Sequence, residues 1–273
     1  MKQEEIEFLK KKAKEIRKDI VTEVYLAKSG HPGGSLSIAD IMAVLYFKEL
    51  NIDNNNPKWE DRDRMILSKG HCAPALYSAL ARRGFFEGKE LEKLRKIDGM
   101  LQGHPDMNKI PGVDITTGSL GQGLSAANGI SLAGKLNKKD YKVYCILGDG
   151  EIEEGQIWEA AMAAAHYKLD NLCVIVDNNN LQIDGKIDDV MNSKPIDQKF
   201  KSFGFEVMNI DGHNIEEIIT AFDVFKGIKG KPTCIIANTV KGKGVSFMEN
   251  QAKWHGKAPN EEEYEQAMKE LGD

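Results

Sequence analysis

Apolar and polar residues alternate along the chain in a pattern that is most regular after Gln122. Short apolar runs, which are typical of buried strands, lie at 141–147, 171–176, 206–210 and 233–237. Stretches with helical spacing of the apolar positions separate them, at 155–168, 197–203 and 215–225. This alternation indicates a parallel sheet whose two faces are covered by helices. We therefore expect a doubly wound α/β fold.

The chain before about residue 110 is less regular. The apolar spacing there predicts helices at 1–28, 38–50, 73–82 and 88–97, the last of them charged. A glycine turn is expected at 30–34, and a short apolar run lies at 65–67. A long irregular section follows at 98–121, and a charged helix is predicted at 261–271. No linker or repeat interrupts the pattern, so we expect a single domain over residues 1–273. Its first part is expected to decorate the sheet edge at which ligands bind.

Composition narrows the class of protein. The formal net charge of −5 argues against a general nucleic-acid binder, and no apolar run approaches the ~20 residues of a membrane span. Residues 1–18 lack the apolar stretch of a signal peptide. The four cysteines stand singly, which predicts reduced core residues rather than a zinc site. These features favour a cytoplasmic protein without nucleic-acid or membrane partners.

The most informative segment joins two polar turns through one predicted helix. Gly148-Asp149-Gly150 follows the strand at 141–147, and Asp177–Asn180 follows the strand at 171–176. Because neighbouring parallel strands end at the same sheet edge, the two turns should lie side by side. Carboxylate and amide oxygens are suitable ligands for Mg²⁺, which commonly binds water and phosphate oxygens as well. The segment therefore predicts a metal-bridged diphosphate at this edge.

Together the two turns resemble the cofactor signature of the thiamine diphosphate enzymes. The resemblance implies that the side chains of Asp149 and Asn179 bind Mg²⁺, with Ca²⁺ or Mn²⁺ as alternatives. It also implies that the Leu181 main-chain carbonyl is the third protein ligand and that the Gly150 amide donates to the diphosphate. Asn179 is preferred to Asn178 because it stands two residues before Leu181, as in the family's pattern.

Histidines indicate which branch of this family the chain resembles. Four of the six lie in loops that contain glycine or proline: His31, His71, His104 and His255. A rigid sheet often carries its catalytic groups on such loops. Imidazoles suit reactions that move protons on and off hydroxyl and carbonyl oxygens near neutral pH. The other two, His166 and His213, lack such contexts and are interpreted as structural.

The sequences around the four histidines resemble the motifs of transketolase in order and spacing. The matching segments are Ser29–Gly33, Leu67–His71, Gly103–Pro105, Thr116–Gly123 and His255–Pro259. The likeness implies that His31 and His255 bind and protonate oxygens of the donor or acceptor sugar. It places His71 near the cofactor diphosphate and the C1 hydroxyl, and it implies that His104 hydrogen-bonds the C1 hydroxyl of the donor.

Further cofactor contacts follow from the same resemblance. Gly118 and Leu120 correspond to the contacts with the aminopyrimidine ring of the cofactor. Glu154 and Glu159 match acidic residues that in relatives lie at the subunit interface and couple to the pyrimidine side of the cofactor. Both pairs are therefore counted among the candidate cofactor-binding residues.

The remaining charged residues near these motifs can be explained without a contact to the cofactor. Glu151 and Glu153 are interpreted as favourable charges in the first turn of a helix, next to the positive end of its dipole. Lys69 and Lys241 either face the cofactor phosphates or are solvated, and Lys241 is retained as a cofactor-binding candidate. The sequence Lys241–Gly244 lacks the spacing of a phosphate-binding loop.

The chain resembles only the diphosphate-binding domain of transketolase. In that family a second domain supplies the glutamate that activates the pyrimidine ring. We therefore expect an N-terminal subunit that pairs with a partner carrying the pyrimidine-binding and C-terminal domains, as two copies of each in a heterotetramer. Met1 and the polar end at Leu271–Asp273 favour a natural subunit over an excised domain.

The resemblance implies transfer of a two-carbon glycolaldehyde (ketol) unit between sugar phosphates, from a ketose to an aldose. The cofactors would be thiamine diphosphate and Mg²⁺, and the setting carbohydrate metabolism such as the pentose phosphate pathway. One alternative is a subunit of a 1-deoxyxylulose-phosphate synthase or of a 2-oxoacid dehydrogenase, although the histidines favour polyhydroxylated substrates. Another is a non-catalytic cofactor-binding module. Sulfosugars and branched sugars remain open as substrates, because acceptor selection is expected to depend on the partner.

Overall fold

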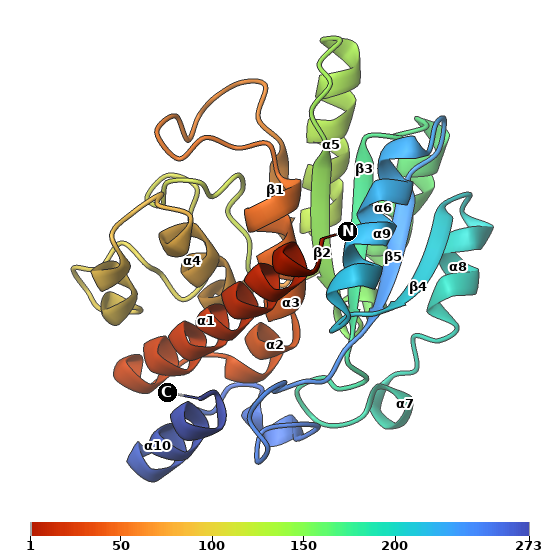
Figure 1. Ribbon diagram of the computed structural model, residues 1–273. Helices are drawn as coiled ribbons and strands as arrows, with labels where there is room; N and C mark the ends of the chain where they lie inside the picture. The colour runs from red at the N-terminus through yellow and green to blue at the C-terminus, as the bar shows by residue number, and fades with distance from the viewer. Residues whose placement is uncertain (1, 273) are drawn as a thin grey trace.

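The structure is a computed structural model that describes residues 2–272. A five-stranded parallel sheet forms the centre of the molecule (Figure 1). Its strands are β1 (Arg64–Leu67), β2 (Val143–Gly148), β3 (Leu172–Asn178), β4 (Glu206–Asp211) and β5 (Thr233–Asn238). Their order in the sheet is β1-β2-β3-β5-β4, and every neighbouring pair is parallel. The prediction of a parallel α/β sheet is confirmed.

Helices cover both faces of this sheet. One face is covered by α1 (Gln3–Ala27), α3 (Ala39–Val44), α4 (Ala73–Arg82) and α9 (Ile215–Gly227), and the other by α5 (Gly123–Leu136), α6 (Gly155–His166) and α8 (Ile196–Ser202). Successive side chains of a strand enter different cores, so that Tyr144 belongs to the first and Cys145 to the second. Burial on both faces explains why the central strands have continuous apolar runs.

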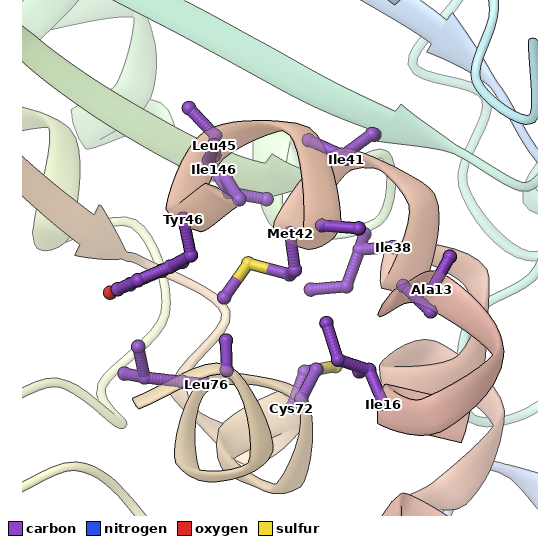
Figure 2. Close-up of a cluster of buried hydrophobic side chains, with 14 of the residues drawn as sticks. Ala13, Ile16, Ile38, Ile41, Met42, Leu45, Tyr46, Cys72, Leu76 and Ile146 are labelled. Atoms are coloured by element: carbon purple, nitrogen blue, oxygen red, sulfur yellow. The ribbon is translucent and has the colours of Figure 1, made fainter. Parts of the chain in front are cut away.

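The N-terminal helices build a dense platform on the first face (Figure 2). Ile16 of α1 and Met42 of α3 lie in one cluster with Cys72 and Leu76, and all four side chains are buried. Close packing of this kind leaves little freedom for the segments that join the helices. The platform therefore holds in place the loop that follows α1 and the loop that precedes α4.

The segment after α1 differs from the sequence prediction. The turn expected at 30–34 already contains the start of a helix, α2 (Pro32–Ser37), because proline favours the first helical position. The single helix expected at 38–50 is replaced by α3 and a π-helical turn at Leu45–Glu49. The Ser37 hydroxyl lies 2.9 Å from the Gly34 carbonyl, close enough to disturb regular helix bonding.

Three further expectations for local structure were wrong or incomplete. The helix expected at 88–97 is a 3₁₀ turn at Gly88–Lys93, because Arg95 takes a left-handed φ of 59° and its N–H bonds to the Leu101 carbonyl at 2.9 Å. The short α7 (Ile187–Val190) was not predicted, since four residues show no periodicity. The first part of the chain also does more than decorate a sheet edge, because it supplies β1 and the helical layer on one face.

The last helix returns the chain to α1. A capping box begins α10 (Glu261–Glu270): the Asn260 side chain accepts from the Glu263 N–H at 2.8 Å, and the Glu263 carboxylate accepts from the Asn260 N–H at 2.9 Å. Tyr264 then stacks on Tyr25 of α1, with 4.2 Å between the ring centroids. This contact fixes the C-terminal helix against the N-terminal one.

Two expectations from composition can be compared with the structure. The four cysteines are free and buried, as predicted. Over residues 2–272, none of the helices combines the length and the apolar character needed to cross a membrane.

Candidate functional site

The ends of β2 and β3 bring the two polar turns together. These strands are neighbours, and their register pairs Gly148 with Asp177. A cavity of about 260 Å³ opens beside them, at the carboxyl edge of the sheet where such folds bind ligands. Its lining includes eleven of the predicted site residues: His31, His71, His104, Gly118, Leu120, Asp149, Gly150, Asn179, Leu181, Lys241 and His255. The other two predicted cofactor residues, Glu154 and Glu159, do not line the cavity.

Asp149 lies at the floor of the cavity and is only 2% exposed. Its carboxylate accepts hydrogen bonds from the Gly150 N–H at 3.0 Å and from the Asn180 N–H. Burial, together with the nearby Asp177, raises the pKa of Asp149 to about 7. A cation beside this carboxylate would keep it ionised at neutral pH, because an opposite charge favours the charged form.

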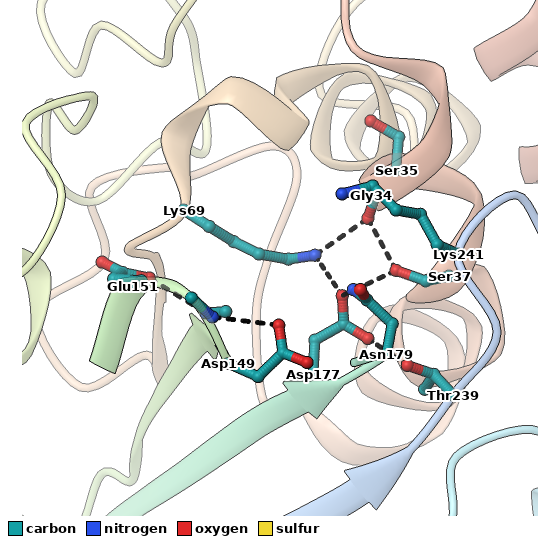
Figure 3. A network of polar contacts seen from close by, with 12 residues as sticks. Gly34, Ser35, Ser37, Lys69, Asp149, Glu151, Asp177, Asn179, Thr239 and Lys241 are labelled. Carbon is teal, nitrogen blue, oxygen red and sulfur yellow. Dashed lines mark hydrogen bonds and ion pairs between the residues drawn. The ribbon is translucent and has the colours of Figure 1, made fainter. Parts of the chain in front are cut away.

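Asp177 organises the polar network beneath the cavity (Figure 3). Its fully buried carboxylate accepts from the Ser37 hydroxyl at 2.6 Å and from the Asn179 amide nitrogen at 2.9 Å, and also from Lys69 and Thr239. The bond to the amide nitrogen fixes the orientation of Asn179. The amide oxygen is thereby turned away from Asp177 and accepts from the Leu181 N–H at 3.1 Å.

Sequence reasoning missed Asp177, Ser37 and Thr239. Asp177 is visible in the sequence as the first residue of the polar turn that contains Asn179, but that position alone does not indicate its role. Ser37 and Thr239 carry no such signal, since isolated hydroxyl residues in distant segments reveal their shared partner only in the folded chain. Their hydrogen bonds compensate for the burial of the Asp177 charge.

Lys69 is one of the two lysines that were predicted to face phosphate or solvent. It lines the cavity but is not solvated, since it is 2% exposed. Its ammonium pairs with Asp177 and donates to the Gly34 carbonyl at 2.9 Å. Burial lowers the pKa of Lys69, but the Asp177 charge outweighs burial and the net shift is upward. A phosphate contact from Lys69 stays a prediction.

The four loop histidines form one cluster along the cavity wall. The ring centroids of His31 lie 5.2 Å from His71, 5.4 Å from His255 and 6.5 Å from His104. Burial is the main cause that lowers the pKa of each ring, to about 4 for His31 and about 3 for His255. The pKa of His71 and that of His104 are lowered too. The rings are therefore neutral at pH 7, and each presents one N–H donor and one acceptor nitrogen.

Lys241 lies between the oxygen donors and the histidines of the cavity. Its ammonium donates to the Leu181 carbonyl at 3.1 Å and lies 3.1 Å from Nδ1 of His255. Burial is the largest cause of the lowered pKa of Lys241. Gly33 permits this position, since a Cβ there would stand 3.1 Å from the Lys241 side chain. The expectation of a solvated lysine at 241 is excluded by its 2% exposure.

Glu151 has a different role from the one expected. It is 3% exposed and is not a solvated charge at a helix end. Its carboxylate accepts from the N–H groups of Gly148 and Gly121, both at 3.0 Å, and from the Ser68 hydroxyl. The end of β2 and two loops are thus joined through one side chain. No signal in the sequence indicates this role, because an acidic residue after a turn is usually solvated.

The remaining candidates lie outside the cavity. Glu154 and Glu159 do not line it, and the Glu154 Cβ packs close to Gly121 at the rim. Their predicted contact with a partner subunit stays a prediction. His166 is exposed at the end of α6, whereas His213 is bonded to Asp40 and to the backbone of Val240.

The donor set of the cavity fits a small divalent cation. It consists of one carboxylate, one amide and one main-chain carbonyl, from Asp149, Asn179 and Leu181. Oxygen ligands of these kinds suit Mg²⁺ when phosphate oxygens complete the shell. In the part of the chain that the structure describes, no group of three or more His, Cys, Asp or Glu side chains forms another metal site. The metal itself and its ligands stay predictions.

Comparisons with known proteins agree with this arrangement. The family described as transketolase, thiamine diphosphate binding domain, matches residues 9–273. The 6-deoxy-6-sulfo-D-fructose transketolase subunit of a Clostridium species is 46% identical, over 96% of each chain. One of the subunits of apulose-4-phosphate transketolase from Phocaeicola vulgatus is 42% identical, over 98% of this chain and 95% of its own.

Full-length enzymes match over part of their length. Human transketolase is 42% identical over 98% of this chain but only 43% of its own, so the chain spans less than half of such proteins. The crystal structure of transketolase from Campylobacter jejuni superposes with a TM-score of 0.90 at 35% identity, covering all of this chain and 43% of that one.

Fold, cavity and comparisons define a thiamine diphosphate-binding α/β domain. More narrowly, the chain belongs to the transketolase family, and its length matches that of separate transketolase subunits. The predictions of the family, of the fold and of a transketolase-type transferase subunit are confirmed.

Proposed function

We propose that this chain is the diphosphate-binding half of a two-chain transketolase that moves a ketol unit from a ketose phosphate to an aldose phosphate. The observation that carries the proposal is the cavity itself, where four neutral histidines lie beside the oxygen donors Asp149 and Asn179. Histidines can exchange protons with sugar hydroxyls, and the oxygen donors suit a metal-bound diphosphate. The relatives of equal length support a subunit of this class.

Asp149, Asn179 and the Leu181 carbonyl would hold Mg²⁺, and the Gly150 N–H would donate to the cofactor diphosphate. Bound thiamine diphosphate would supply the electron sink for breaking and forming the carbon–carbon bond. The contribution of this chain is to fix the diphosphate end and to exclude competing orientations. Gly118 and Leu120, which also line the cavity, would border the aminopyrimidine ring.

The histidines would handle the protons of the sugar. His31 and His255 lie 5.4 Å apart between ring centroids and can together contact one sugar oxygen. His104 packs against Gly118, where a Cβ would come within 3.1 Å of the ring, so it would lie beside the part of the cofactor that Gly118 borders. There it would hydrogen-bond the C1 hydroxyl of the donor. His71 would contact both the diphosphate and that hydroxyl.

The proposal includes a partner chain. Human transketolase extends far beyond the length of this chain, so the remaining domains would come from a separate subunit. We expect a 2+2 heterotetramer in the cytoplasm, with Glu154 and Glu159 facing the partner and residues 1–273 forming one domain. We expect the partner chain to select the physiological sugars, because related subunits are named for different substrates, a sulfosugar and apulose 4-phosphate.

Reconstitution tests the proposal. The chain is mixed with the product of a neighbouring gene that encodes a pyrimidine-binding domain, in the presence of thiamine diphosphate and Mg²⁺. Ketol transfer between xylulose 5-phosphate and ribose 5-phosphate, or their sulfo and branched analogues, is expected from the mixture and from neither chain alone. Pyruvate-dependent CO₂ release would instead indicate a synthase or dehydrogenase subunit. Transfer by this chain alone would exclude an obligate partner.

A further inference from the structure

His213 lies in a buried cluster of charged residues outside the cavity. Its side chain is 14% exposed and stands in the loop between β4 and α9. Nδ1 of His213 is 2.8 Å from the carboxylate of Asp40, at the start of α3. Arg17 of α1 binds the same carboxylate with both terminal nitrogens, one of them at 3.2 Å. Three side chains from separate segments are thus joined.

The second ring nitrogen of His213 binds the main chain next to Lys241. The Val240 N–H donates to Nε2 at 2.8 Å, so Nε2 is an acceptor and the ring proton must sit on Nδ1, where it donates to Asp40. Asp40 therefore selects the tautomer that Val240 requires. Arg17 adds a second anchor, because its Nε donates to the Lys243 carbonyl at 3.1 Å.

The two anchors lie on either side of Lys241. Val240 is held by His213, Lys243 is held by Arg17, and the backbone between them also bonds to α2 through the Gly242 N–H and the Gly33 carbonyl at 2.9 Å. The Lys241 side chain leaves this fixed segment for the cavity. Its ammonium can meet the Leu181 carbonyl and His255 only while the segment keeps this position.

We propose that His213 is a positioning residue for Lys241, with Asp40 selecting its tautomer and Arg17 bracing the same segment. Through Lys241, the cluster would set the affinity of the cavity for the diphosphate end of the cofactor. The inference rests on the proposed function. A buried ionic cluster is weak evidence for stability alone, because the cost of removing charges from water offsets most of their attraction. A role in holding one defined geometry accounts for the arrangement better.

Two substitutions of His213 distinguish its hydrogen bond with Val240 from its hydrogen bond with Asp40. His213→Gln can keep an acceptor near the position of Nε2 and thus the bond from Val240. His213→Asn keeps a donor near the position of Nδ1, for Asp40, but is too short to reach Val240. We expect His213→Asn to weaken the apparent affinity of the assembled enzyme for thiamine diphosphate by about tenfold or more, the range seen for supporting residues around a bound ion. His213→Gln should restore most of that affinity.

The rate at saturating cofactor should fall less than the affinity does in both variants, because the cluster itself does not line the cavity. Hydrogen exchange of residues 239–245, measured by mass spectrometry on the complex, supplies a readout that is independent of activity. His213→Asn should speed exchange there, and His213→Gln should slow it again. His166→Gln, on an exposed histidine, is the matched control and should leave affinity and exchange unchanged.

A double-mutant cycle links His213 to Lys241. If His213 acts through Lys241, then His213→Asn should weaken the affinity of the Lys241→Met enzyme much less than that of the unmodified enzyme. Additive losses, unchanged exchange at 239–245, or a more severe loss in His213→Gln than in His213→Asn would each overturn the inference. Absence of cofactor binding by the unmodified complex would overturn the proposed function instead, while the exchange result would still test whether His213 holds this segment.

Discussion

At the scale of single residues, the cavity depends on polar groups that are buried together with their partners. Asp149 and Asp177 lie at the ends of the neighbouring strands β2 and β3, yet only Asp177 has a lysine as direct partner. Burial raises the pKa of both carboxyls, but for Asp177 the Lys69 charge outweighs it and the net shift is downward, whereas the pKa of Asp149 rises to about 7. Asp149 is thus the carboxylate that gains most from a metal ion, and Asp177 is the one that orients a neighbouring ligand.

Asparagine substitutions decide between the adjacent candidates for the metal. Asn179→Ala should lower the Mg²⁺ affinity of the assembled enzyme at least about tenfold, because mutation of residues that only support metal ligands already lowers affinity by that much. Asn178→Ala is the control, since its amide nitrogen bonds to Asn238 at 2.9 Å and its side chain does not line the cavity. Titration with Mg²⁺ or Mn²⁺ measures the metal affinity of both variants. Equal losses from the two variants would contradict the assignment of Asn179.

The His31 ring should make the folded chain sensitive to acid. Its pKa is about 4 in the fold and about 6.5 in an unfolded chain, so the unfolded state binds the proton first and stability falls as the pH drops between these values. Between pH 7 and pH 5 we expect wild type to lose about 1 kcal/mol more than His31→Asn, after a discount for partial exposure. Urea denaturation at both pH values measures the difference. An equal loss in wild type and in His31→Asn would contradict the prediction.

At the scale of elements, the periodic segments after residue 100 were easier to predict than the irregular ones before it, because apolar spacing marks both their strands and their helices. The apolar runs of β2 and β3 are buried on both faces, and the polar residues that follow them lie together at the carboxyl edge of the sheet. Sequence reasoning therefore located Asp149 and Asn179 correctly at one sheet edge. It did not locate the 3₁₀ turn at Gly88–Lys93, because the bond that ends it comes from Leu101, outside the periodic segment.

The ion pair between α1 and α3 gives a prediction for these elements. Burial raises the pKa of Asp40, but Arg17 and the His213 hydrogen bond together lower it by more, so the net shift is downward. Its contribution to stability is complete above the unfolded pKa of about 4 and is lost as the pH falls through the folded value. Asp40→Asn should cost about 3 kcal/mol of unfolding free energy at pH 7, since it leaves Arg17 without its charge partner.

The loss from Asp40→Asn should shrink as the pH falls below about 4, which chemical denaturation at several pH values would show. Asp223→Asn is the control, because Asp223 pairs with Lys226 on the surface and such pairs contribute little. A loss for Asp40→Asn that does not depend on pH would show that packing, not charge, is responsible.

At the scale of the whole molecule, the chain carries one polar cavity at its sheet edge and spans less than half of human transketolase. The need for a further domain could be inferred from the sequence, because its motifs are all those of the diphosphate-binding domain. The convergence of Ser37, Lys69 and Thr239 on Asp177 could not, since the three come from α2, the loop after β1 and the segment after β5. Only the folded chain shows which isolated polar residues share a partner.

Cofactor binding should stabilise the complex more than the isolated chain. A ligand present at 100 times its Kd adds about 2.7 kcal/mol to the stability of the state that binds it. We expect thiamine diphosphate with Mg²⁺ to raise the melting temperature of the reconstituted complex clearly and that of this chain alone only slightly. Thermal melts with and without EDTA measure this. An equal rise for the isolated chain would mean that this domain alone carries the binding energy.

The histidine cluster has a consequence for how the protein matures. His31 follows the first helix and His255 precedes the last one, yet their ring centroids are 5.4 Å apart. Contacts between residues so distant in sequence require the long intervening chain to be present and are slow to form. During synthesis the nascent chain therefore has no complete cavity until the segment that carries His255 has left the ribosome. Cofactor capture is thus a step that follows translation of nearly all of this domain.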